Sequence, residues 1–142
     1  MQNYKNHAKL SPMYHGVLLL SLLAYLVFAI INLTRHVNAG DTSLQPYLLV
    51  AIGIIFFLFA YIVRSFPLTA QDRIIRAEEN FRHYVLTGKP LDQQLTISQI
   101  IALRFAPDAE FPALVQRAVK ENLSSKEIKT AVKNWRADEH RL

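Results

Sequence analysis

The chain has 142 residues, of which 51% are hydrophobic, and its formal net charge at pH 7 is +5. It contains no cysteine, which excludes a disulfide framework, a thiolate nucleophile and a cysteine-based metal site. Apolar residues dominate the first half, whereas 13 of the 16 Lys and Arg residues and 10 of the 11 Asp and Glu residues lie from Arg64 onward. This division predicts one membrane module followed by one small soluble module.

Two uncharged segments, residues 16–33 and 42–63, are long enough to cross the ~30 Å hydrocarbon core of a bilayer as helices. We expect the spans at about 14–33 and 46–63. A cleaved signal peptide is an alternative for the first segment, because Val37 to Ala39 loosely fits a cleavage site. The segment is, however, longer than the ~7–15 apolar residues of a signal peptide, and Arg35 follows it directly.

The basic residues that flank the spans predict the orientation of the hairpin. They are Lys5 and Lys9 before the first span and Arg64, Arg73 and Arg76 after the second. In the connecting loop, residues 34–45, Arg35 is offset by Asp41. Since positive flanks stay in the cytoplasm, we expect both termini there and the loop outside.

The spans themselves contain no Asp, Glu, Lys or Arg, so the sign of an ion or proton path is missing. In the second span Pro46, Gly53 and Ala60 recur every seven residues. Such small residues predict a face that the first helix approaches closely.

A helix is expected over residues 68–86, because apolar residues recur there with helical spacing. We call these residues the apolar stripe: Ala70, Ile74, Ala77, Phe81 and Val85. Asp72 with Arg76, and Glu78 with Arg82, are expected to pair along the helix. Gly88 and Pro90 supply a stop. Pro67 either kinks one long helix or begins a new one.

Three shorter helices follow. Two capping boxes, at residues 96–99 and 124–127, open helices that are expected to reach Phe105 and about Ala137. The middle helix, with Pro112 in its first turn, is expected to end near Leu123. The inward residues of the last helix are predicted to be Ile128, Ala131, Val132 and Trp135. A core of this size is marginal alone, so we expect it to pack on the 68–86 helix, on a second copy or on another protein.

The predicted fold is therefore all-α. A transmembrane hairpin (residues 1–66) precedes a long amphipathic helix and a small three-helix cytoplasmic domain (residues 67–142).

Residue patterns typical of catalysis are weak. His83 has one plausible ligand neighbour, Glu79, and two ligands do not make a zinc site, so a surface pair is expected. Asp108 and Glu110 lie at a helix start, where carboxylates favour the helix dipole. No Walker loop or dinucleotide fingerprint is present. We expect no catalytic residue, no metal or cofactor site, and no enzymatic activity.

A row of basic residues is expected on the outer side of the last helix: Lys126, Lys129, Lys133 and Arg136. Three interpretations remain open: a solvated face, contact with anionic lipid, or contact with an acidic protein or nucleic acid. Lysine dominates the row, so any contact with DNA would be largely independent of sequence, and nucleic acid is the less favoured partner.

Four segments together resemble one family: KNHA at 5–8, QDRIIR at 71–76, ALRFA at 102–106 and IKTAVKNWR at 128–136. It is an uncharacterised family, a domain of unknown function, of small bacterial two-span membrane proteins. The resemblance implies a location in the bacterial inner (cytoplasmic) membrane, and it supplies no activity, ligand or catalytic residue.

The sequence favours a membrane-anchored scaffold or adaptor, which presents a basic helical domain to a protein or to an anionic membrane. The alternative is a small accessory subunit of a larger membrane enzyme or transporter. The expected partners are the lipid bilayer and either further copies of the chain or a larger membrane complex.

Overall fold

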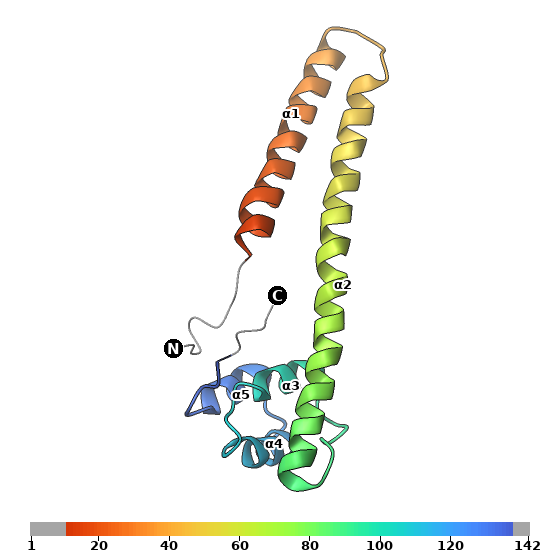
Figure 1. Cartoon of the computed structure of the whole chain (residues 1–142). Coiled ribbons are helices and arrows are strands. Elements are labelled where there is room, and N and C mark those ends of the chain that lie inside the picture. Colours follow the sequence, from red (N-terminus) through yellow and green to blue (C-terminus); the bar gives the residue numbers. More distant parts are fainter. Residues whose placement is uncertain (1–10, 138–142) are drawn as a thin grey trace. The chain divides into compact units, whose positions relative to one another are not determined.

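The computed structural model describes residues 11–137 and shows only helices within that range (Figure 1). The predicted all-α fold is confirmed. Lys5 and Lys9 lie outside the described residues. The elements are η1 (Pro12–Leu18), α1 (Leu19–Asn38), α2 (Gln45–Thr87), α3 (Ile97–Leu103), α4 (Phe111–Lys120) and α5 (Ser125–Ala131).

The chain divides into two compact units, and the division falls after Pro67, inside α2. The hairpin unit (residues 10–67) holds η1, α1 and the first part of α2. The C-terminal unit begins at Leu68 and holds the rest of α2 with α3, α4 and α5. Pro67 lies within one continuous helix, so the alternative of a separate second helix is wrong.

In the hairpin unit α1 and α2 are antiparallel neighbours. The Tyr14 hydroxyl donates to the carbonyl of Ala60 at 3.1 Å, and the Tyr25 hydroxyl donates to that of Leu49, also at 3.1 Å. Gly53 is buried against Tyr25, where an added Cβ would lie only 3.1 Å from the ring. All three members of the predicted small-residue face, Pro46, Gly53 and Ala60, are buried, which confirms it.

Residues 12–38 and 45–87 form two helices that are long and apolar enough to cross a membrane. Their large apolar side chains point mostly outward; Phe28 is 71% exposed and Phe59 is 61% exposed. Helices with apolar side chains around their circumference suit an apolar solvent rather than water.

The C-terminal unit has a conventional buried core. Ile100, Leu103, Phe105, Phe111 and Ile128 are almost completely buried. Both capping boxes are formed, since Thr96 and Ser124 accept hydrogen bonds from the backbone N–H groups of Gln99 and Glu127. α2 ends at Thr87, directly before Gly88, whose φ of +71° favours glycine. The sequence predicted these helix boundaries correctly because they depend on local chemistry.

The small domain packs on α2, which was one of the three predicted alternatives: the Phe111 ring of α4 lies against Arg82 and His83. The face of α2 that carries Ile75, Glu79 and His83 is buried. The apolar stripe lies on the opposite face and is exposed; Ile74 is 57% and Phe81 is 68% exposed. The expected surface pair of Glu79 and His83 is therefore wrong: one face of α2 binds the domain through polar side chains.

The predicted end of the last helix is also wrong. α5 stops at Ala131, and Val132 is extended, with φ −66° and ψ 119°. Glu110 accepts the backbone N–H groups of Lys133 (3.0 Å) and Asn134 (3.2 Å), and the N–H of Arg136 donates to the carbonyl of Phe105 at 2.8 Å. These bonds replace the helical bonds that would have continued α5. Trp135 is half-buried, and the centroid of its ring lies 4.8 Å from the ring centroid of Phe105.

Candidate interaction surfaces

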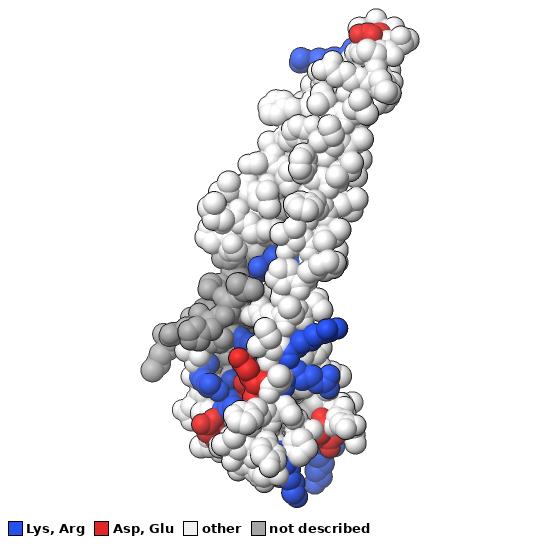
Figure 2. Space-filling view, turned by 45° about the vertical axis from the view of Figure 1, so that its right-hand side comes forward, with Lys and Arg blue, Asp and Glu red and all other residues white. Residues whose placement is uncertain are grey.

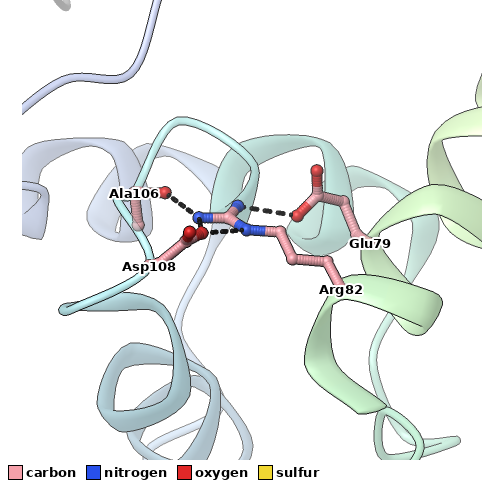
Figure 3. A network of polar contacts seen from close by, with 4 residues as sticks. All are labelled: Glu79, Arg82, Ala106 and Asp108. Atoms are coloured by element: carbon pink, nitrogen blue, oxygen red, sulfur yellow. Dashed lines mark hydrogen bonds and ion pairs between the residues drawn. The ribbon is translucent and has the colours of Figure 1, made fainter. Parts of the chain in front are cut away.

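The Arg82 guanidinium joins several polar groups of the C-terminal unit (Figure 3). It bonds to the Glu79 carboxylate at 2.9 Å, to the Asp108 carboxylate through Nε at 2.7 Å, and to the carbonyl of Ala106 at 2.7 Å. It also lies 4.3 Å from the ring centroid of Phe111. The expected pair with Glu78 is not formed, because Arg82 faces the domain.

This network has a structural role. The Arg82 and Glu79 side chains are only 12% and 8% exposed, so each charge depends on the other. Because its partners come from α2 and from the α3–α4 connection, Arg82 ties the helix to the rest of the unit. Asp108, expected to act on a helix dipole, instead completes this tie.

His83 is also used internally. Its Nδ1 lies 2.7 Å from the carbonyl oxygen of Lys89, and its ring meets that of Phe111 edge-on at 6.0 Å. Within residues 11–137, no group of three or more His, Asp or Glu residues could hold a metal ion. The contact of His83 with the Lys89 carbonyl indicates a structural role, which is to fix the turn that follows α2.

The predicted basic row does not form a continuous helical face. Lys126 and Lys129 lie on α5, and the Lys129 Nζ is 5.9 Å from the ring centroid of Phe105. Lys133 and Arg136 come after the helix end, in the segment held by Glu110 and Phe105. The backbone N–H of Lys133 is the main cause of a lowered Glu110 pKa, with help from Asn134.

The basic residues that follow the second span lie in different settings. The Arg64 guanidinium is 5.6 Å from the ring centroid of Tyr14, inside the hairpin unit. Arg73 and Arg76 are exposed on α2 and line an open groove of about 1020 Å³ together with Lys89 from the turn after the helix. We call this the basic groove.

The basic groove carries three cations, one carboxylate and several amides. The other polar lining residues are Asn80, Asp92, Gln93 and Gln94. Asn80 accepts the backbone N–H of Leu91 at 2.8 Å and so fixes the turn against α2. No ion pair joins Arg73, Arg76 or Lys89 to an acid among residues 11–137. Their charges are therefore available to a partner.

Lys89 was missed by sequence reasoning because it belongs to the stop signal after α2 and not to a basic run. The residues that follow Gly88 fold back along the helix, which brings Lys89 to the groove that Arg73 and Arg76 line. Figure 2 shows that the two units differ in surface charge: Lys and Arg gather over the C-terminal unit, and the hairpin unit carries few charges.

These features define a class: a small all-helical protein with two helices suited to a membrane and a charged helical domain. More particularly, the chain belongs to a family of unknown function, DUF6526, whose model matches residues 1–142. No curated protein and no solved structure matches the chain.

Proposed function

We propose that the protein is a non-enzymatic adaptor of the bacterial inner membrane, anchored by its hairpin unit. Its C-terminal unit presents the basic groove to an acidic partner, either a protein segment rich in Asp and Glu or the headgroups of anionic lipids. Both termini lie in the cytoplasm, as the basic flanks predict.

The basic groove carries this proposal. Arg73, Arg76 and Lys89 line one open depression, and exposed cations with no ion pair among residues 11–137 favour an anionic partner. The neighbouring polar residues Glu79, Arg82 and His83 are not available in the same way, because they hold α2 to the domain. The groove thus replaces the basic row as the favoured contact surface.

The test is a charge reversal with a matched control. A double variant, Arg76→Glu and Lys89→Glu, should release the partner when the full-length chain is purified from native membranes in mild detergent. A second double variant, Lys120→Glu and Lys126→Glu, changes the net charge equally at exposed sites elsewhere. It should keep the partner, which mass spectrometry would identify as a protein or a lipid. Equal loss from both variants would contradict a role for the groove.

The alternative, an accessory subunit, predicts a different result. A larger membrane complex would stay bound through the spans, and the groove variant would still copurify with it at constant stoichiometry. That outcome would replace the adaptor proposal.

Orientation is tested separately, and the absence of native cysteine makes this simple. Ser43→Cys, in the α1–α2 loop, should react with an impermeant thiol reagent in intact cells, and Ser125→Cys should react only after lysis. The reverse pattern would contradict the orientation, and equal labelling would contradict the hairpin.

A further inference from the structure

In the part of α2 that belongs to the C-terminal unit, the large apolar side chains of the apolar stripe are exposed along one face of the helix. Ile74 is 57%, Phe81 is 68% and Val85 is 65% exposed, and the neighbouring Tyr84 is 55% exposed. In a water-exposed domain, a row of this kind marks an interaction site. The domain's own core does not cover it, because α4 and the α3–α4 connection pack on the opposite face, against His83 and Arg82.

The first four residues of the apolar stripe, followed by Tyr84 rather than Val85, have the spacing of a coiled coil. Ala70, Ile74, Ala77, Phe81 and Tyr84 follow one another at alternating steps of four and three residues. This is the heptad pattern in which Ile74 and Phe81 occupy a positions and the other three occupy d positions. Small residues at Ala70 and Ala77 alternate with the large ones, which leaves room for the Phe81 ring beside a facing helix.

The charges beside the stripe specify the occupant. In this register Arg73 is a g residue and Glu78 is the e residue five positions later, and both are exposed. In a parallel homodimer, g of one helix faces e of the next heptad of the other, so Arg73 would meet Glu78 of a second copy twice, once on each side. An antiparallel pair would bring like charges together instead. Two copies anchored in one membrane also leave it in the same direction.

We propose that the apolar stripe is a homodimer interface, a short parallel coiled coil formed by the second part of α2 from two copies of this chain. The helix is already fixed by its own domain, through the Arg82 network and His83, so pairing does not have to order it. Confinement to a membrane raises the effective concentration of the second copy, which compensates for an interface of only about two heptads. The interface shares Arg73 and Ala77 with the basic groove, but the inference rests on the spacing and exposure of the apolar residues and not on a partner of the groove.

The first test is a cysteine scan in the full-length chain reconstituted in liposomes at low protein-to-lipid ratio. Single cysteines at Ile74, Ala77, Phe81 and Tyr84 should form disulfide-linked dimers on mild oxidation. Arg76→Cys is the matched control, because it is exposed on the same helix but outside the stripe. Dimer formation no greater in the scan than in this control would overturn the proposal. If the same positions were instead shielded from a water-soluble maleimide without cross-linking, the stripe would lie on lipid, which also overturns it.

The second test is a charge swap in the Ala77→Cys background, where a small exposed side chain replaces another. Glu78→Arg should lower the yield of cross-linked dimer by about tenfold by placing like charges opposite one another. Adding Arg73→Glu should restore it, because the pair is then reversed rather than broken. Failure of the second substitution to restore the dimer would rule out the parallel register.

Discussion

The eight phenylalanines show how differently the two units of this chain use apolar residues. In the hairpin unit Phe28, Phe59 and Phe66 are 71%, 61% and 70% exposed, whereas in the C-terminal unit Phe105 and Phe111 are completely buried. One sequence thus contains a unit with apolar residues outside and a unit with apolar residues inside. The difference is one of solvent: the first unit suits hydrocarbon and the second suits water.

Phe81 departs from this division. It belongs to the C-terminal unit, yet at 68% it is as exposed as the phenylalanines of the hairpin unit. An exposed phenylalanine in a unit that otherwise buries its phenylalanines indicates a surface that another molecule covers. In the homodimer proposed above, Phe81 would be covered by the second copy.

The largest effect is expected from a core truncation in the C-terminal unit. Phe111→Ala should lower the free energy of unfolding by about 3–5 kcal/mol, because it removes a buried ring and leaves a cavity. The single tryptophan, Trp135, lies in this unit and can report its unfolding in denaturant. Phe59→Ala in the hairpin unit should leave that transition unchanged. If the two substitutions cost the same, the contrast between the units would be wrong.

Next in size is the loss of the Arg82 tie. Arg82→Met should destabilise the C-terminal unit by about 3 kcal/mol, because the Glu79 carboxylate stays buried without its partner. Glu79→Gln added to Arg82→Met should recover part of this loss, since no uncompensated charge then remains. Arg76→Met, on the exposed side of α2, is the control. Thermal unfolding followed by circular dichroism would show whether the double variant is indeed more stable than Arg82→Met.

A smaller effect is expected at Trp135. The side chain is half-buried, so Trp135→Ala should cost roughly 2 kcal/mol, about half the loss for a fully buried aromatic. Trp135→Phe should cost less, because a ring can still stack on Phe105. Circular dichroism would serve here, because both variants lack the fluorophore. A melting temperature equal to that of the parent for Trp135→Ala would show that the segment after α5 contributes no packing energy.

The smallest effect concerns Glu110 and acid. Hydrogen bonds from the backbone of Lys133, and from Asn134, hold its pKa below the ordinary value of 4.5. Its contribution to stability is therefore fully present above pH 4.5 and is lost as the pH falls through the lowered pKa. Glu110→Gln should be less stable than the parent at pH 7, and the difference should shrink on acidification. A difference that is constant with pH would contradict a role for the ionised carboxylate.

Local chemistry explains what the sequence determined by itself. The uncharged segments dictate two long apolar helices, because length and hydropathy need no tertiary partner. The capping boxes at Thr96 and Ser124 work within four residues, and Gly88 ends α2 through its own backbone freedom. The small-residue face of the hairpin was also predictable, because close helix approach requires small side chains.

Only the tertiary structure decided which face of α2 is buried. Periodicity identified the apolar stripe, but the domain packs on the other side, where Arg82 bonds to Glu79 and to the Ala106 carbonyl, and His83 bonds to the Lys89 carbonyl. Periodicity predicts that such polar residues are exposed to solvent, because the partners that allow their burial lie up to 26 positions away in the sequence. The end of α5 was hidden for the same reason: helix propensity favours continuation, and the carboxylate of Glu110, more than twenty residues earlier, takes the backbone N–H groups at the point where the helix stops.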